Sequence, residues 1–166
     1  TVFQSEIDAA CEMVDFWRFN AAFAKDIYSE QPVSVPGMWN QLEYRALEGF
    51  VYAITPFNFT SIGANLPTAP ALMGNTVVWK PAEYSAVSSA VFHELFVRGG
   101  GLPDGVFNVV HADGAATFSG LEQSLEAGLV DKVGFTGSSA VGREIGALTG
   151  RHLQTACLEL GGKNPL

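Results

Sequence analysis

The first part of the chain carries apolar residues at the spacing of one helix face. Successive members are three or four positions apart, which is the period of an amphipathic helix. The members are Ile7, Cys11, Val14, Trp17, Ala21, Ala24 and Tyr28. We expect Ser5 to cap this helix, with Glu6 and Asp8 in its first turn, where the helix dipole favours acidic side chains. Pro32 and Pro36 follow, so the helix should end before them.

From residue 49 onwards the pattern changes to short apolar runs separated by segments with helical spacing. Four runs are rich in β-branched or aromatic residues and lack polar alternation, as buried parallel strands do. They cover residues 49–54, 76–79, 106–110 and 130–135. Helical spacing recurs at 62–73, 87–95, 117–127 and 141–148. Strands that alternate with helices predict an α/β fold with an open parallel sheet, helices on both faces and a long helix in front.

Composition narrows the possible function classes. With 166 residues, 48% of them hydrophobic, the chain can bury one core, which indicates one domain or a large part of one. A net charge of −8 with nine Lys and Arg residues gives no basic stripe, so we expect no nucleic-acid partner. No apolar run is long enough to span a membrane. The three histidines have no metal-ligand spacing, so we expect no metal.

Two cysteines in a chain of this size make no disulfide framework, which fits a reducing compartment. We therefore expect the protein in the cytoplasm, or in the mitochondrial matrix if it is eukaryotic. The chain begins with neither the basic nor the apolar region of a secretory signal.

The residues that directly follow the predicted strands are the first candidates for a site, because ligands of an open parallel sheet bind beyond the carboxyl ends of its strands. Asn58 follows the first strand. Its amide could donate a hydrogen bond to a developing oxyanion, which is worth roughly 3 to 4 kcal/mol in comparable sites. The commoner role of such an asparagine is to cap the next helix.

Two further groups follow strands. Lys80 and Glu83 could hold the ribose of a nucleotide, where a carboxylate repels a 2′-phosphate; a solvated turn is the alternative. Residues 135–139 lead from a strand into a helix N-terminus, whose free NH groups suit a phosphate. They do not form the G-x-G-x-x-G fingerprint, so the motif alone is weak. Gly99 to Gly101 is more consistent with a helix stop than with a phosphate loop.

Glu159 is the only charged residue between Leu153 and Leu160. A carboxylate among apolar neighbours becomes a better proton acceptor near neutral pH, so Glu159 is a candidate general base. A structural carboxylate with a bonded partner is the alternative. Cys157 stands two positions earlier, which would put both side chains on one face of a strand. We expect Cys157 to be a small buried hydrophobic residue rather than a reactive thiol.

Together these residues resemble the aldehyde dehydrogenase superfamily. Five motifs occur in its order and at about its spacing: TPFNF at 55–59, WKPxE at 79–83, GLPxGVxN at 101–108, FTGS at 135–138 and ELGGK at 159–163. Within the superfamily, residues 48–60 and 69–75 are similar to the Δ1-pyrroline-5-carboxylate dehydrogenases. Residues 136–142 and 158–165 resemble semialdehyde dehydrogenases in general.

The resemblance implies a Rossmann-like NAD-binding domain over most of residues 49–166, with residues 1–48 as the preceding helix and connecting segment. It implies NAD-dependent oxidation of an aldehyde to a carboxylate, with glutamate γ-semialdehyde of proline catabolism as the substrate. Asn58 would stabilise the oxyanion and Glu159 would activate the hydrolytic water. The implied cofactor-binding residues are Ile54, Thr55, Pro56, Phe57, Lys80, Glu83, Gly137, Ser138, Leu160 and Gly161.

The family's nucleophilic cysteine lies a few dozen residues beyond the general-base glutamate, at a position that this chain does not contain. The resemblance therefore implies the remainder of the enzyme chain as a partner, a homo-oligomer when complete, and no activity for residues 1–166 alone. Two other functions stay open: another semialdehyde dehydrogenase, or a truncated, non-catalytic chain. A related NADP-dependent reductase is disfavoured by Glu83.

Overall fold

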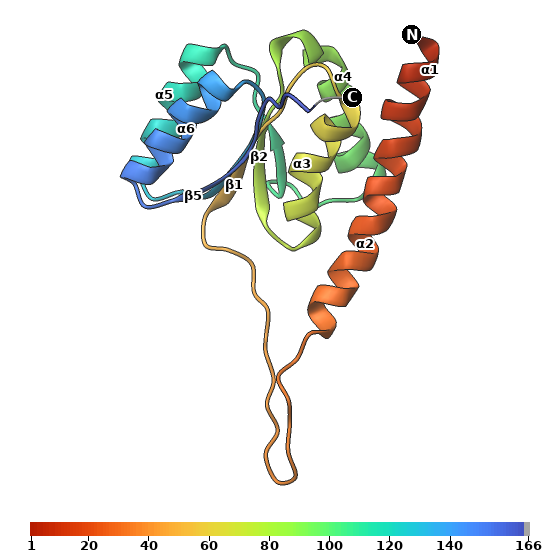
Figure 1. Ribbon diagram of the computed structural model, residues 1–166, viewed down its shortest axis with the longest axis vertical. Helices are drawn as coiled ribbons and strands as arrows, with labels where there is room; N and C mark the ends of the chain where they lie inside the picture. The colour runs from red at the N-terminus through yellow and green to blue at the C-terminus, as the bar shows by residue number, and fades with distance from the viewer. Residues whose placement is uncertain (165–166) are drawn as a thin grey trace.

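The computed structural model describes residues 1–164, which begin with one long helix (Figure 1). It consists of α1 (Val2–Ser5), the π-helical segment η1 (Glu6–Glu12) and α2 (Met13–Ser29). The predicted helix is confirmed, but the predicted cap is wrong. Thr1 caps the helix and forms a capping box with Gln4, so Ser5 lies inside it.

Five parallel strands form the sheet: β1 (Phe50–Ile54), β2 (Thr76–Lys80), β3 (Phe107–Val109), β4 (Val130–Thr136) and β5 (Thr155–Glu159). Their order is β3-β2-β1-β4-β5. The four predicted strands are confirmed. The fifth was not predicted as a strand, because it lies at the sheet edge and alternates between exposed and half-buried residues.

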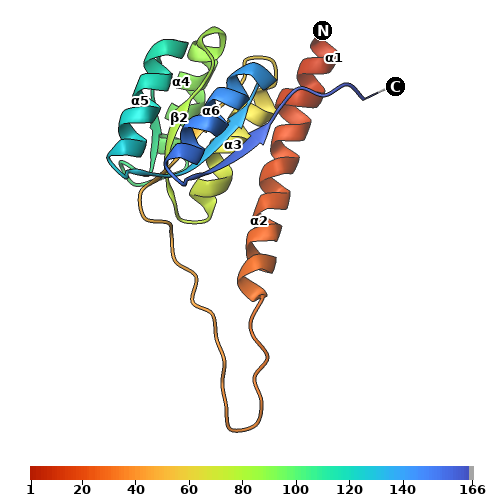
Figure 2. The ribbon, with the colours of Figure 1, turned by 60° about the vertical axis from the view of Figure 1, so that its left-hand side comes forward.

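Helices cover both faces of the sheet, as predicted (Figures 1 and 2). One face carries α3 (Thr60–Leu72), η2 (Glu83–Ser85), α4 (Ala86–Glu94) and η3 (Leu95–Gly99). The other carries α5 (Gly114–Glu126) and α6 (Ser139–Arg151). Each face of the sheet carries one hydrophobic core, and β1 contributes side chains to both. Val51 and Ala53 pack on the α3 side, and Tyr52 and Ile54 pack on the α5 and α6 side. This alternation is the period of a strand buried on both faces.

The long helix lies against α3 through polar as well as apolar contacts. Trp17 Nε1–H donates to Thr68 Oγ1 at 3.1 Å, and Asn20 donates to Asn65 at 2.7 Å. Of the apolar positions predicted to share a buried face, Ala24 alone is fully buried, while Ile7, Val14 and Tyr28 stay exposed. The apolar face predicted from the spacing therefore coincides only in part with the helix surface that contacts α3.

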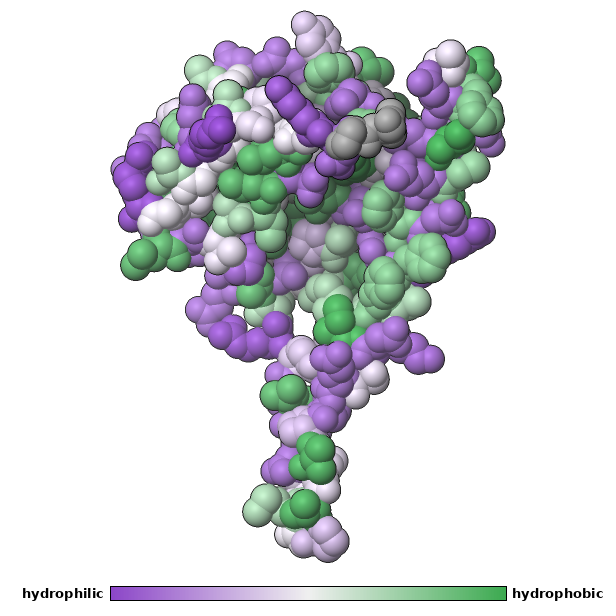
Figure 3. All heavy atoms as spheres, viewed as in Figure 1, coloured by the Kyte–Doolittle hydropathy of each residue, from purple (hydrophilic) through white to green (hydrophobic). Residues whose placement is uncertain are grey.

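Residues 30–49 form an extended arm that projects from the body of the molecule (Figures 1 and 3). A single antiparallel bridge joins Val35 and Met38 near its tip. The arm exposes large apolar side chains, of which Val33 and Trp39 are each 82% exposed. Within residues 1–164, no helix is long and apolar enough to cross a membrane.

Candidate active site

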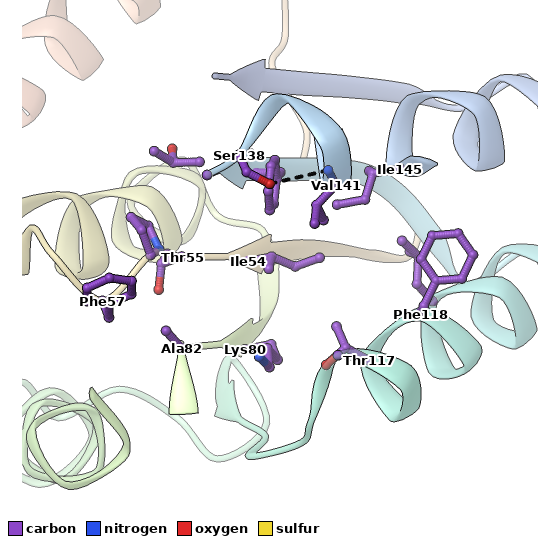
Figure 4. Close-up of a pocket in the computed structure, with 16 residues that line it drawn as sticks. Ile54, Thr55, Phe57, Lys80, Ala82, Thr117, Phe118, Ser138, Val141 and Ile145 are labelled. Carbon is purple, nitrogen blue, oxygen red and sulfur yellow. Dashed lines mark hydrogen bonds between the residues drawn. The ribbon is translucent and has the colours of Figure 1, made fainter. Parts of the chain in front are cut away.

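A largely apolar groove of about 280 Å³, called here the apolar groove, lies at the carboxyl ends of β1, β2 and β4 (Figure 4). It follows from the strand order, because the helices after β1 and β4 leave on opposite faces of the sheet. Its lining residues are Ile54, Thr55, Pro56, Phe57, Lys80, Ala82, Gly114, Thr117, Phe118, Leu121, Phe135, Thr136, Gly137, Ser138, Val141 and Ile145.

The ends of β1 and β2 are fixed to each other beside the groove. The Thr55 amide donates to the Lys80 carbonyl at 3.2 Å, and Trp79 Nε1–H donates to Thr55 Oγ1 at 2.9 Å. Lys80 ends β2 and is only 8% exposed, so the solvated-turn alternative is wrong for it. Glu83 begins η2 and is exposed. The groove wall at this point is Ala82, and Glu83 is not among the lining residues.

The N-terminus of α6 forms another part of the groove wall (Figure 4). Ser138 caps this helix by accepting the Val141 amide at 3.3 Å. The Gly137 amide donates to the Glu159 carbonyl at 3.1 Å, which joins this turn to the end of β5. A Cβ on Gly137 would stand 2.6 Å from Cζ of Phe135. Glycine thus lets the turn pass close to the phenylalanine ring that lines the groove.

Asn58 and Glu159 come together in an adjoining cavity of about 430 Å³, called here the Asn58–Glu159 pocket. Leu160 and Gly161 line it as well, so the predicted residues of the last motif lie there and not in the apolar groove. Both cavities share the same wall, made of Pro56, Phe57, Thr136, Gly137 and Ser138. A ligand in the groove would therefore border the space between Asn58 and Glu159.

Asn58 lies in the bend between β1 and α3 and is exposed. The cap of α3 is Phe59, which makes no capping side-chain bond, so the helix-cap alternative for Asn58 is wrong. The Asn58 side chain therefore does not cap α3, and capping does not compete with a ligand for its amide. This leaves it available as a hydrogen-bond donor.

Glu159 and Cys157 lie on the same face of β5, as predicted, but both are exposed. The expectation of a buried Cys157 is wrong, because β5 is an edge strand whose outer residues nothing in residues 1–164 covers. Pro56, Phe57 and Leu160 line the same cavity as Glu159, so apolar neighbours are present, but within residues 1–164 they leave Glu159 exposed. No ion pair of Glu159 is found within residues 1–164, so the structural-carboxylate alternative gains no support.

A third cavity, of about 500 Å³, lies between the long helix and Asn58 and is called here the helix-side pocket. The acidic residues Asp8 and Glu12 are among those that line it. Sequence reasoning missed this contribution, because it assigned Asp8 to the first turn of its own helix. The signal was the spacing of Asp8 and Glu12, which places two acids on one face of that helix.

Sequence reasoning also missed one side of the apolar groove. Gly114, Thr117, Phe118 and Leu121 share one face of α5, and Val141 and Ile145 share one of α6. Helical spacing could have indicated these faces, but not that both helices border one groove. Among residues 1–164, no three His, Cys, Asp or Glu side chains form a group that could hold a metal.

Comparison with known proteins identifies one enzyme family over nearly the whole chain. The model of the aldehyde dehydrogenase family matches residues 2–166. The chain is 43% identical to a protein of Schizosaccharomyces pombe named probable delta-1-pyrroline-5-carboxylate dehydrogenase, over 98% of this chain and 31% of that protein. It is 51% identical to the mitochondrial delta-1-pyrroline-5-carboxylate dehydrogenase of Rattus norvegicus, over 83% of this chain and 24% of that protein.

A solved structure is similar in fold as well. The delta-pyrroline-5-carboxylate dehydrogenase of Mycobacterium tuberculosis bound with NAD superposes with a TM-score of 0.90 at 47% identity, over 99% of this chain and 31% of that chain. The present chain thus spans less than a third of the length of these relatives. Its motifs, its sheet and its adjoining cavities agree with this match, and the chain belongs to the aldehyde dehydrogenase family.

Proposed function

We propose that the complete protein oxidises glutamate γ-semialdehyde to glutamate with NAD, and that residues 1–166 supply the cofactor groove and two of the reacting groups. One observation carries this proposal. The Asn58–Glu159 pocket brings an amide donor and a carboxylate together, and it shares a wall with the apolar groove. An aldehyde held between the two side chains would therefore lie beside whatever occupies the groove.

The groove fits a dinucleotide. Its apolar walls suit an adenine ring, the α6 N-terminus at Gly137 and Ser138 suits a pyrophosphate, and the buried Lys80 can donate to ribose hydroxyls. Ile54, Thr55, Pro56 and Phe57 form the floor between these positions. When bound, NAD supplies the hydride acceptor. We propose that Glu83, just outside the lining, acts by repelling a 2′-phosphate.

Asn58 and Glu159 act at different moments in this proposal. The Asn58 amide donates to the oxygen of the aldehyde as negative charge develops on it. Glu159 takes a proton from the water that later releases the carboxylate product. The nucleophilic thiolate comes from the remainder of the enzyme. Neither Cys11 nor Cys157 lines the Asn58–Glu159 pocket or the helix-side pocket.

The choice of substrate has two supports. The relatives described above are named for Δ1-pyrroline-5-carboxylate, and the acidic residue Glu12 lines the helix-side pocket next to Asn58. An acidic wall suits an aldehyde that also carries an ammonium group, as glutamate γ-semialdehyde does.

The test is steady-state kinetics of the complete enzyme. We expect kcat/KM for glutamate γ-semialdehyde to exceed that for butanal, which lacks both charged groups, by at least about 10²-fold. NAD should be preferred to NADP. Equal kcat/KM values for the two aldehydes would refute the substrate assignment, and a preference for NADP would refute the role of Glu83.

We also propose that the complete protein is a homo-oligomer in the cytoplasm or the mitochondrial matrix. The exposed apolar side chains of the arm, among them Val33 and Trp39, are of the kind that other protein surfaces cover. The mitochondrial name of the rat relative supports the matrix for a eukaryotic source. The division of the chain into an N-terminal helix with its connecting segment, residues 1–48, and an NAD-binding domain, residues 49–166, stays a prediction.

A further inference from the structure

The start of α3 is capped by a residue from a different helix. The α3 cap position, Phe59, has no side-chain oxygen to offer, and the first helical residue is Thr60. The Thr60 amide donates to Asp8 Oδ2 at 2.8 Å, and the Ser61 hydroxyl donates to Asp8 Oδ1 at 2.7 Å. Asp8 thus does for α3 what a cap residue of the same segment normally does.

The site of this contact is well defined. Ser61 is completely buried, and Asp8 is half-buried within the π-helical segment η1. Glu12 Oε2 is a second, longer acceptor for the Ser61 hydroxyl, at 3.1 Å. The negative charge of Asp8 also lies at the positive end of the α3 dipole, which strengthens the contact.

The contact bears directly on Asn58, because Thr60 is only two residues further along the chain. The Asn58 side chain is exposed and lies in a bend, so its own contacts do not fix it. The bend is held at one end by β1 and at the other by Thr60. Loss of the bond between Thr60 and Asp8 would release one end of the bend that carries Asn58.

We propose that Asp8 is a positioning residue, which places the Asn58 amide by capping α3 from the long helix. The inference rests on the proposed oxyanion role of Asn58. It assigns the N-terminal helix a part in the reaction that is separate from binding substrate. A displacement of about 1 Å in a reacting group can cost up to 10²-fold in rate, so a cap can affect catalysis without touching the substrate.

The experiment is a double-mutant cycle in the complete enzyme, with Asp8→Ala, Asn58→Ala and the pair. We expect Asp8→Ala to lower kcat by about 10-fold, with the Kd for NAD unchanged. In the Asn58→Ala background, the same change should lower kcat by less than about 2-fold, because the donor that Asp8 positions is gone. The kcat of each variant is calculated per NAD-binding site, as counted by NAD titration, so that a smaller amount of folded protein does not lower the value.

Asp8→Asn separates capping from charge. Asparagine keeps an oxygen for the Thr60 amide but loses the negative charge, so we expect kcat within about 3-fold of the parent enzyme. If the alanine variant does not fold, Ser61→Ala, which removes one of the two bonds that hold Asp8, takes its place in the cycle, with a smaller loss of kcat expected. Asp15→Ala is the matched control, because Asp15 is an exposed acid on the same long helix and pairs with Arg18 at 3.8 Å. It should leave kcat unchanged.

Three results would overturn the proposal. The first is an unchanged kcat in Asp8→Ala when Asn58→Ala lowers it, which leaves the proposed function intact. The second is an equal loss in Asp8→Asn and Asp8→Ala, or full additivity with Asn58→Ala, because Asp8 would then act through charge or independently. The third is an unchanged kcat in Asn58→Ala, which refutes the oxyanion role and leaves Asp8 no donor to position.

Discussion

The apolar groove and the Asn58–Glu159 pocket share a wall but differ in how far residues 1–164 enclose their polar groups. In the groove, Lys80 is 8% exposed and the ends of β1 and β2 are tied by hydrogen bonds. In the pocket, Asn58 and Glu159 are both exposed. Elements of this chain thus suffice to build the proposed cofactor site, whereas the proposed reacting groups stand on an open surface. This difference fits an enzyme whose remaining chain covers the catalytic side.

The largest expected effect concerns residues 1–166 on their own. We expect this chain to bind NAD but to form no NADH from any aldehyde, because neither of its cysteines lines the pocket of Asn58. NAD binding by calorimetry and NADH absorbance test the two halves separately. Aldehyde-dependent NADH formation that disappears in Cys157→Ser would contradict the assignment.

Glu159→Gln in the complete enzyme should stop turnover after hydride transfer. Glutamine keeps the size of glutamate but takes no proton, so release of the product should slow by roughly 10² to 10⁴-fold. Stopped-flow absorbance should still show a burst of NADH near one equivalent per active site. A missing burst with normal NAD binding would assign Glu159 to an earlier step. Glu144→Gln, an exposed carboxylate on α6, is the control.

Asn58→Ala in the complete enzyme should lower kcat by about 10² to 10³-fold while the Kd for NAD stays nearly unchanged. The reason is that the amide is used mainly in the transition state. Steady-state kinetics and NAD titration together test this. If NAD affinity falls as much as the rate, Asn58 belongs to the groove or to folding, and the distinction between the two cavities fails.

Lys80→Ala should have the opposite profile. We expect the Kd for NAD to rise about 10-fold, which corresponds to roughly 1.4 kcal/mol, while kcat at saturating NAD stays within about 3-fold. The cause is the loss of a buried cation from the groove wall. Lys25→Ala, on the exposed side of α2, is the matched control. A fall in kcat without a change in the Kd for NAD would assign Lys80 to the reaction rather than to cofactor binding.

The smallest effect compares Gly137, which lies on the wall shared by both cavities, with Gly161, which lines only the Asn58–Glu159 pocket. A Cβ on Gly137 would stand 2.6 Å from the Phe135 ring, whereas a Cβ on Gly161 would have its nearest neighbour, Ser139 Oγ, at 3.7 Å. We expect Gly137→Ala to raise the Kd for NAD by about 5-fold, because the ring must shift into the groove. Gly161→Ala should leave that Kd within about 2-fold. Equal effects in calorimetry would show that the groove accommodates the shift.

The sequence by itself determined four of the five strands and indicated the two side chains that we propose to react. Four of the strands were readable because strands buried on both faces are continuous apolar runs, as Val51 to Ile54 shows. The motifs around Asn58 and Glu159 were readable because they are local. β5 was not readable in this way, since its exposed and half-buried residues reflect its place at the edge.

Only the tertiary structure decided which residues meet. The strand order puts β4 between β1 and β5, which brings Asn58 and Glu159 to one pocket and α5 and α6 to one groove. It left Glu83 outside the groove and Cys157 exposed. It also joined Asp8 to Thr60, which is 52 residues away in sequence. Periodicity reports which face of an element is apolar, but the partner of a polar side chain depends on how whole elements pack.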